Sequence, residues 1–247
     1  MADDGIDAVY TAAGLREAAP ASAKRPNRRG EQTRDKLVRA AVECFTEYGY
    51  TRTRISDITN RANTAQGNFY RHFTGIDDIF LAALKPSLEE LAAARLRPDH
   101  AHGERESLIK VNTTYLQAYA RNRHMLRLLR EAAAASENRG FQQLWLNLRG
   151  DFVRRTERWL DRLDEQGIID EPHRHMLAET LGCATEQMAY VHVGLPTRTP
   201  RPEEIVDLGT ALGEFWFRSL PLTDSTADTA DPTAADTTAV DTTPAGT

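Results

Sequence analysis

Hydrophobic side chains recur every three or four residues along most of the chain, the spacing that places them on one face of a helix. The first such face comprises Leu37, Ala41, Cys44, Phe45 and Tyr48. Gly49 follows it at the position where a helix commonly ends in a left-handed glycine. Convincing strand-like alternation appears nowhere, so the sequence predicts an all-α fold.

The same spacing predicts a series of further helices. Their ranges are 54–62, 66–73, 77–97, 104–121, 123–135, 137–166, 171–193 and 202–219. Thr53 stands at the N-cap position of the first of these. Pro86 lies inside the range 77–97, where it should kink or split the helix.

Both ends of the chain differ in composition from the rest. Residues 1–30 are rich in Ala, Asp, Pro and Gly and show no clear amphipathic period. Residues 221–247 are dominated by Thr, Ala and Asp and contain no base. Because such segments bury too little apolar surface to offset the entropy of ordering, both are expected to be disordered, which leaves an ordered body of about residues 31–220.

The formal net charge of −5 conceals an asymmetry. Residues 24–72 hold eleven bases and five acids, a net of +6, which leaves −11 for the rest of the chain. A basic segment on an acidic body points to an anionic partner at one end, although a solvated charged face explains the charge alone at least as well. The run KRPNRRG at residues 24–30 is open to two interpretations, an arm reaching into a DNA groove or a solvated linker.

Composition argues against several classes of protein. The cysteines are Cys44 and Cys183, too few for a four-cysteine zinc site, and they suggest a reducing compartment. No run approaches the about 18 apolar residues of a membrane span, and residues 1–23 lack the basic region and apolar stretch of a signal peptide. We therefore expect a cytoplasmic protein, associated with the nucleoid if it binds DNA.

The most informative stretch is RISDITNRANTAQGNFYRHF, from Arg54 to Phe73. It predicts two short helices that meet at Asn63, and asparagine is, after glycine, the residue that best tolerates the positive φ of such a corner. The predicted buried face comprises Ile55, Ile58, Ala62, Phe69 and Phe73. The side chains left for other faces are Gln66, Asn68, Tyr70, Arg71 and His72. Because Gln, Asn and Arg can read base edges and Tyr and His commonly hold phosphate, this helix-turn-helix predicts DNA recognition.

The run that starts at Thr33 resembles the DNA-binding domain of the TetR family of transcriptional regulators. The resemblance rests on three stretches, TRDKLVRAAVECFTEYGY, TRISDITNRANTAQGNFYRHF and DDIFLAAL. Three positions depart from it. Asn63 stands where the family usually has Gly, and Ile76 lies where members commonly place a phosphate-binding Lys. Ala65 replaces the usual capping Ser or Thr, which loses about 1 kcal/mol unless Thr64 caps one position earlier.

The resemblance implies a two-fold dimer of helical subunits. Each subunit would have a three-helix N-terminal head that binds operator DNA and a larger C-terminal helical domain that binds a small effector and dimerises. In this chain the head would be residues 31–76 and the C-terminal domain residues 77–220, between the extension 1–30 and the tail 221–247. The residues expected at the DNA are Thr53, Arg54, Gln66, Gly67, Asn68, Tyr70, Arg71 and His72.

Two further sets of residues are expected in the C-terminal domain. Large aromatic and flexible side chains in the middle helices suit a small, largely apolar effector. The candidate cavity walls are Tyr115, Tyr119, Met125, Leu129, Trp145, Leu148, Phe152, Cys183, Gln187 and Tyr190. The candidates for a dimer interface on the last two helices are Leu181, Met188, Leu212, Phe215, Trp216 and Phe217. Ordinary burial within the chain remains the competing explanation for both sets.

The leading hypothesis is a ligand-responsive dimeric regulator, a repressor that an effector releases from a palindromic operator. Its partners would be double-stranded DNA, a small effector and a second copy of the chain, with no membrane, metal or cofactor. One alternative is an all-α enzyme or ligand carrier with a vestigial helix-turn-helix, and another is an architectural DNA-binding protein without an effector. Since no Ser–His–Asp pattern, Gly-rich phosphate loop or HExxH motif is visible, we expect no enzyme.

Overall fold

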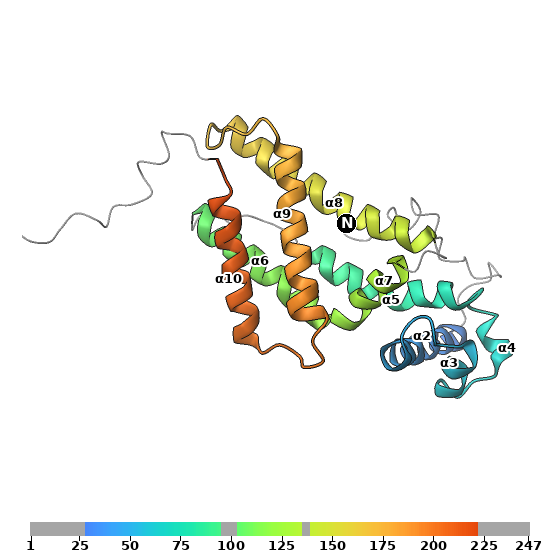
Figure 1. Cartoon of the computed structure of the whole chain (residues 1–247). Helices are drawn as coiled ribbons and strands as arrows, with labels where there is room; N and C mark the ends of the chain where they lie inside the picture. Colours follow the sequence, from blue (N-terminus) through green and yellow to red (C-terminus); the bar gives the residue numbers. More distant parts are fainter. Residues whose placement is uncertain (1–27, 95–102, 135–138, 222–247) are drawn as a thin grey trace, which may run out of the picture.

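The computed structural model describes residues 28–94, 103–134 and 139–221, and the elements of these ranges are helices (Figure 1). They are α2 (Arg28–Tyr48), α3 (Ile55–Arg61), α4 (Gln66–Phe69), α5 (Ile76–Ala93), α6 (Glu104–Arg121), α7 (Arg123–Ala134), α8 (Arg139–Glu165), α9 (Arg174–Ala189), the π-helical turn η2 (Tyr190–Gly194) and α10 (Pro202–Arg218). Helices α2 to α4 form a head at one end, and α5 to α10 form a larger body (Figure 1). The predicted all-α fold is confirmed.

Several helix ends differ from the sequence-based expectation. α2 already begins at Arg28, so residues 28–30 are helical and do not belong to an extension. α4 ends at Phe69 because the next residues tighten into a turn, in which the His72 N–H donates to the Phe69 carbonyl at 2.9 Å. The disorder expected of residues 1–27 and 222–247 falls outside the described residues.

α5 passes through Pro86 without splitting. Leu84 and Leu88, on either side of the proline, are both buried against the core. This packing outweighs the helix hydrogen bond that a residue without an N–H cannot make.

A small hydrophobic core holds the three head helices together. Leu37 and Phe45 from α2, Ile58 from α3 and Phe69 from α4 are fully buried in it. Asn63 adopts a φ of +47° between α3 and α4, which confirms the left-handed corner predicted for it. The fixed corner sets the angle at which α4 leaves α3 and reaches the surface.

The N-terminus of α3 is capped one residue later than predicted. Arg54 is the N-cap residue, and its N–H donates to Asp57 Oδ2 at 2.9 Å. Thr53 is 6% exposed, and its hydroxyl donates to the Gly49 carbonyl at 2.7 Å. The prediction of Thr53 as N-cap is therefore wrong, because its hydroxyl instead fastens the connection between α2 and α3.

Four aromatic rings join the head to the body. Phe80 of α5 has its ring centroid 5.0 Å from that of Phe45, 4.8 Å from that of Tyr50 and 5.3 Å from that of Phe141 in α8. The Tyr50 hydroxyl also donates to Asp77 Oδ1 at 2.5 Å, at the start of α5. Edge-on and tilted ring contacts of this kind add to the burial of the rings themselves.

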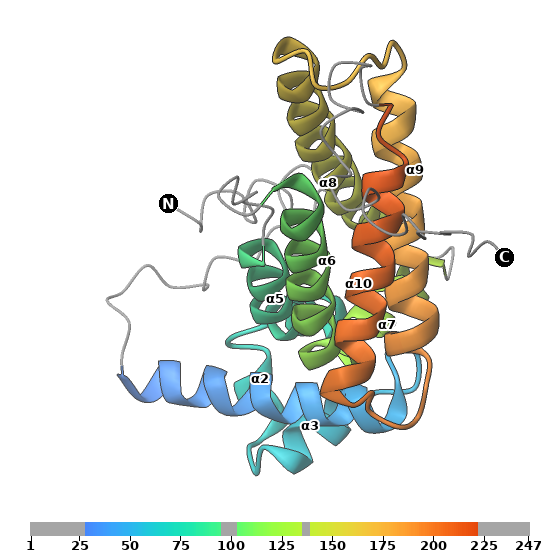
Figure 2. The ribbon, with the colours of Figure 1, turned by 90° about the vertical axis from the view of Figure 1, so that its left-hand side faces the viewer.

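Helices α6 and α10 lie side by side in the body (Figure 2). Two glycines of α10, four residues apart, make the approach close. A Cβ at Gly209 would lie 2.6 Å from the Thr113 Cα, and one at Gly213 would lie 2.4 Å from the Ile109 Cα. Because real Cβ atoms do not come so near to backbone, only glycine fits at these two crossings.

Three residues expected at a dimer interface are instead buried within the chain. Leu181 is fully buried, and Leu212 and Trp216 are 3% and 1% exposed. The Trp216 Nε1 donates to Thr185 Oγ1 at 3.0 Å, and its ring lies 6.1 Å from that of Trp159. Neighbouring helices of the same chain already cover these side chains, so they are core residues and not surface available to a partner.

A buried arginine anchors the loop that follows η2. Arg123, at the first position of α7, is 4% exposed. Its guanidinium donates to the carbonyls of Pro196 at 2.7 Å, Thr197 at 3.0 Å and Arg198 at 3.1 Å. Since a buried charge is tolerated only when its donors are used, Arg123 fixes the loop between η2 and α10 against α7.

We expect Gly213→Ala to destabilise the protein by about 1–3 kcal/mol or more, because the new methyl overlaps the α6 backbone. Gly150→Ala is the matched control in α8, since its Cβ would meet the movable end of Arg154 at 3.1 Å. That change should be neutral or stabilising, as alanine replaces glycine inside a helix. Chemical denaturation of both variants measures the difference, and equal stabilities would contradict the close helix crossing.

Candidate nucleic-acid interface and ligand cavity

Helix α4 and the turn after it present polar side chains on the surface of the head. Gln66, Gly67 and Arg71 are exposed, and Tyr70 is 56% exposed. Phe69 is fully buried beneath them and anchors the segment in the head core. This arrangement offers amide, phenol and guanidinium groups together on one rigid turn, which is the chemistry used for base edges and phosphates.

Three other predicted DNA contacts differ in how accessible they are. Arg54 is exposed at the start of α3. Asn68 is half-buried, and its Nδ2 donates to Thr64 Oγ1 at 3.1 Å. Thr64 thus supports α4 and the turn after it, residues 66–72, which we call the recognition segment, while Ala65 is the uncapped N-cap residue. Thr53 is buried with its hydroxyl already used, and the structure therefore removes it from the residues that could touch DNA.

His72 is half-buried at the end of the recognition segment. Burial lowers the pKa of its ring below the usual value, and the positive charges of Arg71 and Arg34 lower it further. The ring is therefore neutral at pH 7, and it can offer one N–H to a phosphate without adding charge.

Some of the basic charge of the head is already paired within it. Arg61 donates to Glu47 Oε2 at 2.5 Å and to the Tyr48 hydroxyl at 3.2 Å. At the start of α2, Arg28 and Arg29 are exposed and held on a helix.

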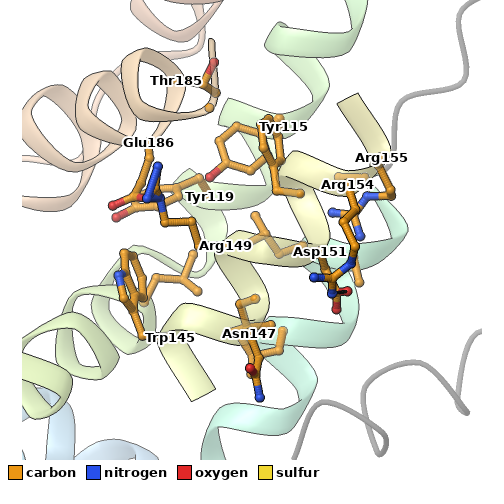
Figure 3. A pocket seen from close by; sticks show the side chains of 18 of the residues that line it. Tyr115, Tyr119, Trp145, Asn147, Arg149, Asp151, Arg154, Arg155, Thr185 and Glu186 are labelled. Atoms are coloured by element: carbon orange, nitrogen blue, oxygen red, sulfur yellow. Dashed lines mark hydrogen bonds and ion pairs between the residues drawn. The ribbon is translucent and has the colours of Figure 1, made fainter. Parts of the chain in front are cut away.

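A cavity of about 620 Å³ lies in the body (Figure 3). Helices α5 to α10 all contribute to its wall. Six predicted wall residues do line it, namely Tyr115, Tyr119, Leu129, Trp145, Leu148 and Phe152. Leu88 and Leu91 of α5 add to its apolar lining.

Four predicted wall residues lie elsewhere. Met125 is buried in the hydrophobic core, and Cys183 and Gln187 are exposed on α9, where they accept hydrogen bonds from Arg149 and Arg130. Tyr190 is half-buried beneath the guanidinium of Arg130, whose Cζ is 3.8 Å from the ring centroid. Their spacing placed them on helix faces, but the neighbouring helices decide which face meets the cavity.

The structure also adds wall residues that the sequence reasoning missed. Trp216, expected at a dimer interface, lines the cavity instead. The charged members of the wall are Arg149, Asp151, Arg154, Arg155, Arg158 and Glu186. A signal for Arg155 was present, because it follows Leu148 and Phe152 at helical spacing and so shares their face of α8.

Glu186 is the carboxylate of the wall that faces two arginines. Its oxygens lie 3.8 Å from Arg130 Nη1 and 3.9 Å from Arg149 Nε. Burial raises the pKa of Glu186, and these two positive charges oppose the rise. Burial likewise raises the pKa of Tyr115 and of Tyr119, so both phenols stay protonated hydrogen-bond donors.

A chain of hydrogen bonds crosses the wall between three helices. Trp216 Nε1 donates to Thr185 Oγ1 at 3.0 Å, and Thr185 Oγ1 donates to Asn112 Oδ1 at 3.5 Å. Asn112 Nδ2 donates in turn to the Leu108 carbonyl at 3.0 Å. These polar groups satisfy one another's hydrogen bonds, which fixes α6, α9 and α10 around the cavity.

The outer faces of α9 and α10 remain as candidate interfaces. Along α9 and η2 an exposed stripe without charged residues comprises Met176, Thr180, Cys183, Gln187 and Val191. Of the other predicted interface residues, Phe215 is 42% exposed, whereas Met188 and Phe217 are half-buried.

Two further findings concern the described residues. They contain no group of three or more His, Cys, Asp or Glu side chains arranged to hold a metal ion. None of their helices combines the length and the apolar run that crossing a bilayer requires.

Comparison with curated proteins finds similar regulators. The probable acrEF/envCD operon repressor of Escherichia coli (strain K12) is 31% identical over 113 residues, which cover 43% of this chain and 51% of that protein. The HTH-type transcriptional regulator TcmR of Streptomyces glaucescens is 33% identical over 72 residues, 29% of this chain and 32% of that protein. The chain thus spans about half the length of the first relative and about a third of the length of the second.

Solved structures share the fold. A TetR-family transcriptional regulator from Syntrophomonas wolfei superposes with a TM-score of 0.60 at 17% identity, covering 78% of this chain and 99% of that one. The SmeT–triclosan complex superposes with a TM-score of 0.58 at 20% identity, covering 87% of this chain and 100% of that one. Residues 37–83, which include the helix-turn-helix, match the family model described as bacterial regulatory proteins, tetR family. Residues 37–83 of this chain therefore carry the DNA-binding domain of the bacterial regulatory proteins of the tetR family, and the chain shares its fold with regulators of that family.

Proposed function

We propose that the protein is a dimeric transcriptional repressor that binds a palindromic operator and is released from it by a small effector in the body cavity. The observation that carries the proposal is the exposed set Gln66, Tyr70 and Arg71, held on a rigid turn inside the segment that matches the family. The protein works by binding rather than by catalysis, in the cytoplasm where operator DNA is found.

The head side chains divide by the part of DNA that they suit. Gln66 and Arg71 can form two hydrogen bonds to a base edge in the major groove. Tyr70 and Arg54 suit phosphate oxygens, and phosphate contacts position the head without reading sequence. A single head of this size buries little DNA surface, so two heads reading half-sites about 34–36 Å apart would supply the specificity that one lacks.

The uncharged stripe of α9 supports a two-fold interface. The residues of the stripe carry no charge, as is usual at an interface centre, and its two ends are the apolar side chains of Met176 and Val191, whereas Arg149 and Arg130 reach Cys183 and Gln187 in its middle. On α10, Leu208, Ala211 and Phe215 form a second apolar row at helical spacing. Figure 2 shows α9 and α10 next to each other, as an isologous four-helix contact requires.

Two helices connect the ligand cavity to the aromatic junction with the head. α5 contributes Leu88 to the cavity and Phe80 to the aromatic junction, and α8 contributes Trp145 to the cavity and Phe141 to the junction. A ligand that shifts either helix therefore shifts the head. Lowering operator affinity 100-fold needs a preference of about 2.7 kcal/mol for the shifted state, and DNA must then weaken ligand binding by the same factor.

Arg71→Ala should weaken operator binding by about 1–3 kcal/mol and relax sequence preference, because it removes a guanidinium that can pair with guanine. Tyr70→Phe should weaken binding to cognate and scrambled duplexes about equally. Arg162→Ala is the control, since Arg162 is exposed on α8 and lies outside the cavity and the head. Titration of each variant against both duplexes tests the assignment, and wild-type operator affinity in Arg71→Ala would overturn the role of Arg71.

Phe215→Glu should convert the dimer to monomers and abolish operator binding while the fold persists, because it places a charge in the proposed interface. Val206→Glu is the matched control. Val206 is 45% exposed on the same helix but nine positions away, which is half a turn around the helix axis. Light scattering of both variants decides the matter, and a monomeric Val206→Glu beside a dimeric Phe215→Glu would place the interface on another face.

A further inference from the structure

The cavity wall carries charge at two places, and the first is balanced. Near α9, Glu186 lies 3.8 Å from Arg130 Nη1 and 3.9 Å from Arg149 Nε. Arg149 also forms an ion pair with Glu179. Two carboxylates and two guanidinium groups thus face one another there, so this end leaves no net charge for a ligand to meet.

The second place is the middle of α8, where the described residues that line the cavity carry more positive than negative charge. Arg154, Arg155 and Arg158 line the cavity there, and Asp151 is the carboxylate that lines it beside them. Asp151 accepts a hydrogen bond from Arg154. Figure 3 shows Asp151, Arg154 and Arg155 together on the side of the cavity away from Glu186.

Helix periodicity aims one of these arginines inward. Leu148, Phe152, Arg155 and Trp159 succeed one another by four, three and four residues and so share a face of α8. Arg155 is half-buried, and its positive charge opposes the rise that burial causes in the pKa of Tyr115. A guanidinium on the same face as two apolar wall residues is placed to hold the head of a ligand whose body lies on the apolar side chains.

The wall also has an apolar part. Leu88 and Leu91 from α5 and Leu129 from α7 contribute to it, together with Trp145. A wholly apolar ligand would gain nothing from these guanidinium groups, which attract anions and not hydrocarbon. A ligand with an acidic group at one end would use them, since guanidinium donors match carboxylate and phosphate oxygens.

We propose that the cavity binds an amphipathic anion, with its acidic group at Arg155 and Arg158 and its hydrocarbon part along Leu88, Leu91 and Trp145. This assignment rests on the proposed function in one respect, because it gives the chemical class of the effector. The binding step itself requires no DNA and can be measured apart from it.

The test uses three probes with the same ten-carbon tail, namely decanoate, decanol and decyltrimethylammonium. The full-length chain is titrated without DNA, below the aggregation limit of each probe, and the fluorescence of Trp145 and Trp216 in the cavity wall reports binding. Decanoate should bind at least about tenfold more tightly than decanol, and the cation should bind most weakly.

The double variant Arg155→Gln and Arg158→Gln should lower decanoate affinity about tenfold, to the level of decanol, and leave decanol binding unchanged. Arg162→Gln is the control, because this exposed arginine of α8 does not line the cavity and should keep the full preference for decanoate. Thermal unfolding of both variants checks that the fold is retained.

Four results would overturn the assignment. These are equal affinities for decanoate and decanol, tightest binding of the cation, an undiminished preference in the double variant, and no binding of decanoate at all. Decanoate that binds with the expected preference but does not release operator DNA supports the assignment and counts against the proposed release mechanism. Failure of the two proposals is therefore distinguishable.

Discussion

The ring of Phe80 is where the head and the body meet. It packs against Phe45 and Tyr50 of the head and against Phe141 at the beginning of α8. Protein interiors are close-packed, so none of these rings can move far unless the others follow or the contacts break. The orientation of the recognition segment relative to the body therefore depends on this cluster, and two helices of the ligand cavity end in it.

Elsewhere in the body, buried polar groups decide which arrangement of the helices is adopted. Arg123 is satisfied only if the loop after η2 brings its carbonyls to the start of α7. Asn112 and Thr185 satisfy each other and Trp216 only if α6, α9 and α10 keep their present distances. Apolar packing tolerates small shifts, but an unsatisfied buried donor is costly, so these bonds select one arrangement from many similar ones.

The parts predicted correctly from the sequence are those set by local chemistry. Helical spacing gave the helices nearly to their ends, and the tolerance of asparagine for positive φ located the corner at Asn63. Thr53 was misjudged because a hydroxyl can serve either as a cap or as a tie to the preceding helix, and only the path of the chain decides.

The cavity shows the limit of the same reasoning. Tyr115 and Phe152 were found because large side chains on inward faces are common to cores and cavities alike. Arg155 was passed over because a charged residue is normally taken to face solvent. Trp216 was assigned to a dimer interface because it lies in an apolar stripe of the last helix. Helical spacing predicts that such a face is buried, but it does not tell whether the same chain or a second copy buries it.

The glycines at 209 and 213 have a mechanical consequence. Since α10 packs directly on the backbone of α6 at these two glycines, we expect the two helices to move as one rigid unit, because no side chains separate them there. This unit contributes Tyr115 and Tyr119 to the cavity wall, and it exposes Phe215 at the proposed contact with a second subunit. Any widening of the cavity must then be taken up by the other wall helices α5, α7, α8 and α9, and two of these, α5 and α8, carry the rings Phe80 and Phe141 that join the body to the head.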